Sequence, residues 1–374
     1  MRRALAVTVC LAATAHASPW TVGGEAGTEV DTNVQRVETP SEDMTVPITA
    51  FVGRFGAHVD YKSQLFGGNL AFNLSDLTRL VADAEASVEN VTTLAGNARW
   101  LHALGDRPAA LGLGVMAIDA IPLSDPVGAR TFRTLGPDAL LALQSDEDRT
   151  LSLALGLRDF RYKPDPNFDW WGPVASARLE LVLWQPAAKT RSLELAGTLS
   201  FENRTFYTGL ALANACAPDA PPSSEQCTGP TDIQRRDRYQ RASLELTWIG
   251  RQLATLAYQI TVIDSNSYGQ SLARHRVTLS ATTQLPWELY GTLIAILQYD
   301  QYLDGLVVRP ELQQQEFTSI EDENRSSLQL RVARHISSQL AVEARAAVWR
   351  NITLRTNQPS FERELLYIGL VYGK

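Results

Sequence analysis

The residues with the widest chemical repertoire, histidine and cysteine, are few and dispersed in this chain. Beyond the N-terminal segment the histidines are His58, His102, His275 and His335, and none lies at a metal-binding spacing from another. His275 has basic neighbours but no acid or nucleophile close in sequence. The sequence therefore predicts no catalytic residue, no metal site, no cofactor and no enzymatic activity.

Two cysteines, Cys216 and Cys227, lie in a polar segment rich in Ala, Pro and Ser. Because an exported chain meets an oxidising environment, we expect them to form a disulfide within a loop. The formal net charge of -7, without a basic patch or a stacking platform, argues against nucleic acid as a partner.

Ionic side chains form the most extensive pattern, recurring along one face of successive segments. Between residues 241 and 248, Leu244, Leu246 and Trp248 alternate with Arg241 and Glu245, and similar alternation follows in 255–262 and 276–282. Alternation with period two is typical of strands with one apolar and one polar face. In a membrane barrel the polar face lines the lumen, since each such residue would cost about 2 to 4 kcal/mol at lipid mid-depth. A large solvated face is the alternative explanation. The residues predicted to line the lumen are Arg54, Asp83, Glu85, Arg158, Arg178, Glu180, Glu194, Arg241, Glu245, Arg276, Arg331, Glu343 and Arg345.

The elements that must position these residues are sixteen predicted strands, with fourteen or eighteen as alternatives. They span residues 20–37, 45–62, 64–75, 78–103, 108–122, 133–145, 149–163, 173–184, 190–209, 236–249, 252–264, 272–285, 288–302, 324–335, 339–352 and 360–372. Their apolar faces contain only every second residue. No stretch beyond the N-terminal segment has 18 consecutive apolar residues, so no membrane-spanning helix is predicted.

The connections alternate between short and long. Short turns are expected at 62–63, 105–107, 145–148, 186–189, 250–251, 286–287 and 337–338. Long connections are expected at 164–172, 210–235, 265–271 and 303–323, and the one exception is a short third link at 75–77. Short periplasmic turns and long external loops are typical of outer-membrane barrels. The sequence thus predicts an all-β fold, a transmembrane antiparallel up-and-down β-barrel of about 16 strands, with both termini in the periplasm.

The N-terminus has the pattern of a secretory signal peptide. Met1 to Arg3 are followed by a short apolar run, Ala4 to Thr14, and by the small-x-small site Ala15 to Ala17. We therefore expect residues 1–17 to be a signal peptide and residues 18–374 to be a single barrel domain. The expected location is the outer membrane of a Gram-negative cell envelope.

An aromatic external loop and an acidic cluster are the candidate binding features. Four rings in residues 162–171 are either headgroup anchors or a platform for stacking sugars. An acidic cluster in 316–323 is either solvated loop charge or a site that holds divalent cations against lipopolysaccharide. The candidate sugar-stacking residues are Tyr162, Phe168, Trp170 and Trp171, and the acidic residues are Glu316, Glu321, Asp322 and Glu323.

The last predicted strand places Leu366, Ile368, Leu370 and Tyr372 on one face. This pattern resembles the C-terminal signal of outer-membrane proteins, which the barrel-assembly machinery reads, although two residues follow the aromatic here. The resemblance implies that machinery, outer-membrane lipid and lipopolysaccharide as partners.

Function is predicted from the width of the barrel. Sixteen strands are wide enough for an aqueous channel. The predicted loop after the fifth strand, residues 123–132, is too short to narrow it, so a constriction would require 210–235 or 303–323 to fold inward. Two segments, 202–207 and 235–239, loosely resemble loops in the barrel part of exopolysaccharide exporters of the poly-N-acetylglucosamine type, here without the tetratricopeptide domain. That resemblance implies a conduit for export of a polar polymer and a separate periplasmic export protein. The alternatives are a passive diffusion porin for small solutes and a structural or adhesive barrel in a cell-surface or motility complex.

Overall fold

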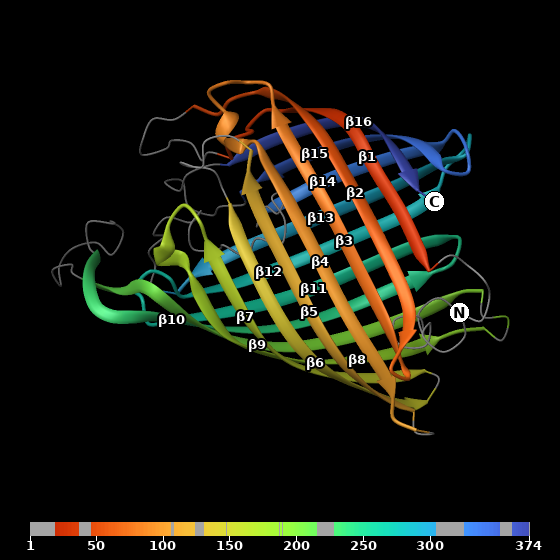
Figure 1. Cartoon of the computed structure of the whole chain (residues 1–374), viewed down its shortest axis with the longest axis horizontal. Coiled ribbons are helices and arrows are strands. Elements are labelled where there is room, and N and C mark those ends of the chain that lie inside the picture. The colour runs from red at the N-terminus through yellow and green to blue at the C-terminus, as the bar shows by residue number, and fades with distance from the viewer. Residues whose placement is uncertain are drawn as a thin grey trace.

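The computed structural model shows one continuous wall of tilted strands (Figure 1). It describes residues 19–36, 46–105, 108–123, 131–146, 148–186, 188, 190–214, 228–303, 325–351 and 361–373. The signal peptide, the two cysteines and the acidic cluster predicted from the sequence lie outside these residues. In the described part of the chain, no helix is long and apolar enough to cross a membrane.

Sixteen strands account for most of the described chain, which also contains two short 3-10 helices, η1 (Ser87–Glu89) and η2 (Pro166–Phe168). The strands are β1 (Trp20–Asp31), β2 (Ala50–Leu65), β3 (Gly68–Val81), β4 (Val91–Ala103), β5 (Ala109–Pro122), β6 (Phe132–Asp146), β7 (Arg149–Tyr162), β8 (Trp170–Trp184), β9 (Ser192–Asn214), β10 (Thr228–Ile249), β11 (Gln252–Ser265), β12 (Leu272–Gln284), β13 (Leu289–Tyr302), β14 (Ser326–His335), β15 (Leu340–Arg350) and β16 (Glu362–Gly373).

Each strand pairs antiparallel with its neighbours in the chain, and β1 pairs with β16 to close the barrel. The closing register runs from Gly23 opposite Gly373 to Asp31 opposite Leu365. Because every strand has two partners, the sheet has no free edge, as lipid requires. The predicted all-β fold and the count of sixteen strands are confirmed.

The connections at the two ends differ as expected. Pairs such as Phe66–Gly67, where both residues have positive φ, and Gly250–Arg251 join strands at one end. Both chain ends of the described barrel lie there as well (Figure 1). The wider gaps between strands lie at the opposite end, which is the external end in outer-membrane barrels.

Several predicted boundaries were wrong, and two of these errors matter for the inner wall. Among the others, the turn expected at 62–63 lies within β2, and Phe66–Gly67 forms the turn instead. The supposed strand 78–103 is interrupted, since β3 ends at Val81 and β4 begins at Val91. Residues 82–90 form an external link, in which the Asp83 carboxylate accepts the backbone N–H of Glu85 at 2.8 Å. Such local side-chain bonds compete with strand pairing. The link also removes the short exception expected at 75–77, so the alternation of connections is regular.

The second error concerns the ninth and tenth strands, which are longer than predicted. Strand β9 continues to Asn214 and β10 begins at Thr228, opposite Asn214. This hairpin projects beyond the neighbouring strands (Figure 1). Segments 202–207 and 235–239, which were compared with exporter loops, lie within β9 and β10.

The outer face of the barrel is apolar. Leucines alternate outward along the strands, with exposed fractions such as 68% for Leu155, 65% for Leu199 and 59% for Leu244. The C-terminal set Leu366, Ile368, Leu370 and Tyr372 also faces outward. A closed barrel with an exposed apolar exterior can span lipid without unpaired backbone groups. The barrel fold and its predicted outer-membrane location are confirmed.

Aromatic side chains flank this apolar face. Trp184 and Trp248 stack with ring centroids 5.9 Å apart at the short-turn end. His275 stacks between Tyr258 and Tyr299 on the outer face and bonds to the Tyr258 hydroxyl at 2.7 Å. Amphipathic rings of this kind belong to the interfacial girdles of membrane barrels. The contacts of His275 are therefore those of a girdle residue.

Leu279→Arg tests the assignment of faces. Leu279 faces outward on β12 and is 39% exposed, whereas its neighbour Thr278 faces inward. We expect Leu279→Arg to lower the free energy of unfolding by about 2 to 4 kcal/mol, because a charge then lies in lipid. Urea unfolding in phospholipid vesicles measures this. Thr278→Arg is the matched control, and an equal loss in both variants would contradict the assignment.

Candidate functional site

The inner wall of the barrel contains most of the charged residues predicted to line the lumen. Eleven of the thirteen lie in strands, at positions that alternate with the exposed apolar residues. Asp83 and Glu85 do not, because they belong to the external link after β3. The eleven inner-wall residues are Arg54, Arg158, Arg178, Glu180, Glu194, Arg241, Glu245, Arg276, Arg331, Glu343 and Arg345.

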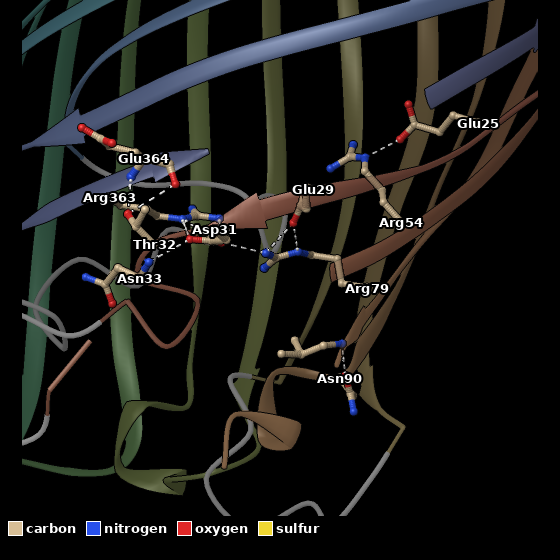
Figure 2. A network of polar contacts seen from close by, with 11 residues as sticks. Glu25, Glu29, Asp31, Thr32, Asn33, Arg54, Arg79, Asn90, Arg363 and Glu364 are labelled. Atoms are coloured by element: carbon tan, nitrogen blue, oxygen red, sulfur yellow. Dashed lines mark hydrogen bonds and ion pairs between the residues drawn. The ribbon is translucent and has the colours of Figure 1, made fainter. Parts of the chain in front are cut away.

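A buried ionic network crosses the seam where β1 meets β16. The Asp31 carboxylate lies between Arg363 of β16, at 2.6 Å, and Arg79 of β3, at 3.0 Å (Figure 2). Arg79 also binds Glu29 at 2.7 Å, and the backbone N–H of Asn33 donates to Asp31. The four charged side chains are at most 2% exposed. We call Glu29, Asp31, Arg79 and Arg363 the seam network.

A second row of charges lies on the same side of the barrel. Glu25 accepts from Arg54 at 2.7 Å and from Arg345 at 2.8 Å, and Glu343 accepts from both Arg345 and Arg331. The Tyr367 ring lies between the Arg54 and Arg345 guanidinium groups, whose central carbons are 5.7 and 4.8 Å from its centroid. These cross-strand contacts tie β14, β15, β16, β1 and β2 together on the lumen side.

The Tyr367 ring needs two glycines beneath it. A Cβ on Gly27 would lie 2.6 Å from the ring, and a Cβ on Gly369 would lie 2.1 Å from the hydroxyl oxygen. Gly27 and Gly369 are directly opposite each other on β1 and β16. The missing side chains therefore let the ring lie along the seam.

On the other side of the barrel, three arginines share one buried carboxylate. Glu202 of β9 accepts from Arg204 at 2.6 Å through Oε1, and from Arg241 at 3.3 Å and Arg158 at 3.4 Å through Oε2. Glu202 is 1% exposed, whereas the side chains of Arg241 and Arg158 are 20% and 33% exposed. We call Arg158, Glu202, Arg204 and Arg241 the arginine cluster.

Aromatic rings hold Arg204 in place. Its guanidinium carbon lies 4.2 Å from the Trp170 ring centroid and 3.7 Å from that of Tyr239. The Arg204 side chain is only 3% exposed. Cation–π contacts and the bond to Glu202 therefore fix this arginine from three sides.

Toward the short-turn end the same wall carries several carboxylates. Arg178 binds Glu180 at 2.8 Å and lies 3.6 Å from Glu245, and the Ser192 hydroxyl donates to Glu194 at 2.7 Å. Three carboxylates, those of Glu180, Glu194 and Glu245, thus lie toward this end of the wall.

The predicted sugar-stacking rings do not form one platform. Trp170 faces inward and is 3% exposed, in a cluster with Phe132, Phe160 and Phe206, whereas Trp171 faces outward and is 45% exposed. The two tryptophans are the first two residues of β8, and adjacent residues of a strand point to opposite faces. Tyr162 packs edge-on against Phe168, which lies in η2. The prediction treated residues 162–171 as a loop and so overlooked the alternation.

Two external segments pack on the inner wall near the seam. Val34 of the first external connection and Ala86 of the link after β3 are fully buried against Val52 and Val81. Arg36 and Asn33 of the first segment are also buried. The external mouth is therefore partly covered on the β1–β3 side, by segments that the sequence did not single out as narrowing the barrel.

Some important inner-wall residues were not predicted from the sequence. Glu25, Glu29 and Asp31 follow the same period of two in the first strand, so the alternation contains a signal for them. Glu202 and Arg204 also follow this period within the predicted strand 190–209, but their segment was compared with exporter loops and its faces were not assigned. Among the described residues, no group of three or more His, Cys, Asp or Glu side chains could hold a metal ion.

The chain matches no known family model and no curated protein. Among solved structures it is similar to OccK8 (OprE) of Pseudomonas aeruginosa, with 9% identity, 95% of this chain and 98% of that chain covered, and a TM-score of 0.48. OprB of Pseudomonas putida has 9% identity, coverages of 95% and 94%, and a TM-score of 0.46. OmpT of Vibrio cholerae has 12% identity, coverages of 97% and 100%, and a TM-score of 0.41. No function is transferred at these levels of similarity, and none of these three is an exopolysaccharide exporter by its description.

Arg363→Ala tests the seam network. Removing one partner from a buried ion pair costs about 3 to 5 kcal/mol, because the remaining charge stays buried. We expect a loss of that order in the free energy of unfolding in vesicles. Arg350→Ala is the control, since Arg350 and Glu362 form an exposed pair across β15 and β16. Its loss should be below about 1 kcal/mol. Similar values for both variants would show that the network does not stabilise the seam.

Proposed function

We propose that this protein is a diffusion channel for small polar solutes in the outer membrane. The observation that carries the proposal is solvent exposure of ionic side chains on the inner wall. Arg178 and Glu245 are 37% and 38% exposed on one side, and Arg331 is 50% exposed on another. Charged groups inside a closed barrel remain exposed only where water reaches them, since an unpaired charge in a dry interior is costly.

The width of the barrel and the character of its wall support passage of small solutes. Sixteen-stranded barrels leave an aqueous lumen rather than filling it with their own side chains. Here the lining carries both signs of charge, and external segments around Val34 and Ala86 cover part of the mouth. A narrowed, charged passage fits small ions and polar metabolites.

The observations that led the sequence analysis to predict polymer export are not supported by the structure. That prediction depended on the lack of an obvious constriction after the fifth strand, and on the likeness of two arginine-bearing segments to exporter loops. Those segments belong to β9 and β10, and the mouth is partly covered near β1. The proposed channel also needs no separate periplasmic export protein.

Two interactions with the envelope belong to the same proposal. The outward row from Leu366 to Tyr372 on β16 would be read by the barrel-assembly machinery, and the exposed apolar exterior would contact outer-membrane lipid and lipopolysaccharide. Deleting the last strand should therefore abolish assembly, whereas a channel variant changed only on the inner wall should still assemble.

Conductance in a planar bilayer tests the channel. We expect the refolded protein to give repeated, steady current steps in KCl that scale with salt concentration, because the lumen contains water. Liposomes that contain the protein should swell in isotonic solutions of small sugars but not in those of large oligosaccharides. A correctly folded barrel that gives neither current nor swelling would overturn the proposal. If only long polysaccharide blocked the current, the result would favour a conduit for polymer export instead.

A further inference from the structure

The external part of β10 carries two arginines on the outer side of the barrel. The odd-numbered residues from 235 to 239 are buried on the inner side, whereas Arg236, Arg238 and Gln240 are exposed. These three residues continue the outward row of Leu244, which faces lipid. Because successive residues of a strand point to opposite faces, the two guanidinium groups lie on the outside of the barrel.

The height of these arginines follows from the length of the strand. Trp248 belongs to the aromatic girdle at the short-turn end, and Arg238 precedes it by ten residues on the same face of β10. A strand rises about 3.3 Å per residue and is tilted by about 40°, so Arg238 lies about 25 Å above Trp248. The apolar band of a membrane barrel is also about 25 Å tall. Arg238 therefore lies at the boundary with the headgroups of the outer leaflet, and Arg236 lies just beyond it.

Neither guanidinium group has a hydrogen bond or an ion pair with another side chain in the described part of the chain. Asp264 is the ladder partner of Arg238 on β11, but no ion pair joins them. Only the backbone N–H of Arg236 is engaged, since it donates to the Asn266 side chain at 2.8 Å. Each guanidinium thus keeps its five N–H donors, in a fixed fork that matches phosphate oxygens.

Other basic side chains on the outer face near the external end are paired with acids. Lys163 is 2.6 Å from Asp119, and Arg161 is 3.1 Å from Asp159. The two arginines of β10 differ from these because their donors remain available to an acceptor outside the protein.

Neutral polar side chains of β9 adjoin the two arginines. Thr205 is the ladder partner of Arg236, and Asn203 is the ladder partner of Arg238. A hydroxyl and an amide at these positions can donate to the same oxygens as the guanidinium groups. Trp171 of β8 lies opposite Thr205 and is 45% exposed, as expected of a ring in the external girdle. We call Asn203, Thr205, Arg236 and Arg238 the outer-face patch.

We propose that the outer-face patch binds a phosphate group of lipopolysaccharide in the outer leaflet. The ligand is a phosphate monoester on a glycolipid, whose acyl chains lie along the apolar exterior below the patch. The two forked guanidinium groups approach the phosphate from β10, and the side chains of β9 complete its hydrogen bonds. Strand β10 is paired with both neighbours at Arg238, so the donors are held at a constant height. The inference needs the outer-membrane location but not the proposed channel function.

Binding of lipid A, the phosphorylated glycolipid anchor of lipopolysaccharide, tests the proposal. The full-length protein is refolded in detergent micelles, and native mass spectrometry measures the bound lipid. We expect Arg236→Gln together with Arg238→Gln to raise the dissociation constant at least about tenfold, because charge-assisted hydrogen bonds to phosphate are lost. Each single variant should give a smaller change in the same direction. Arg236→Lys together with Arg238→Lys should be intermediate, since lysine keeps the charge without the fork.

Arg334→Gln is the matched control for the single variants. Arg334 is exposed on β14, in the outward row of Leu330, but lies at the short-turn end. This variant therefore removes one charge from the same face on the opposite side of the membrane, and it should leave the dissociation constant for lipid A unchanged. Heat-modifiability on gels confirms that each variant is folded.

Two further ligands distinguish the sources of phosphate. Lipid A without its phosphates should bind weakly, and inorganic phosphate should not displace lipid A at equal concentration because it lacks acyl chains. If the dephosphorylated lipid bound as well as lipid A, or if the double glutamine variant kept wild-type binding, the phosphate site would be overturned. Displacement by inorganic phosphate at equal concentration would overturn the assignment to a lipid headgroup. A barrel that binds lipid A through these arginines but conducts no current would overturn the channel alone.

Discussion

Closure of the backbone hydrogen-bond ladder is the constraint on which the whole structure depends. In lipid an unpaired strand edge cannot be hydrated, so the first and last strands must meet. Strands β1 and β16 do so over nine residue pairs, from Gly23–Gly373 to Asp31–Leu365. The seam network lies on the lumen side of this joint, where Asp31 links β1 to Arg363 of β16 and to Arg79 of β3 (Figure 2). The pairing of the first and last strands is thus accompanied by ion pairs between residues that are distant in sequence.

Charged residues on the inner wall form two groups in different environments. The balanced, buried pairs at the seam resemble structural salt bridges, in which loss of one partner is more costly than the pair is stabilising. In the arginine cluster Glu202 and Arg204 are buried, whereas Arg158 and Arg241 are partly exposed. Burial, rather than the number of ionic residues, distinguishes the two groups.

The external end departs from the simple rule of an apolar exterior and a polar interior. Phe132, Phe160, Trp170 and Phe206 face inward there and are almost fully buried, with Phe160 stacked between Phe132 and Trp170. On the other side, Val34 and Ala86 cover Val52 and Val81. Inner apolar surfaces at this end are covered by packing against one another and against external segments. The polar passage accordingly lies deeper, alongside the arginine cluster and the acids below it.

The sequence by itself determined the class of fold, the sixteen strands, and which face of most strands meets lipid, because period-two alternation is a local property of each segment. It placed Arg158, Arg241 and Arg276 on the polar face for the same reason. It misplaced the boundary between β3 and β4, at 75–77 instead of 82–90, since Asp83 and Glu85 continue the alternation through a link held by a local hydrogen bond. Nor could it show that Arg158, Arg204 and Arg241 share Glu202, or that Asp31 meets Arg363. Those contacts join residues that are distant in sequence, and only the register of neighbouring strands and the closure of the barrel bring them together.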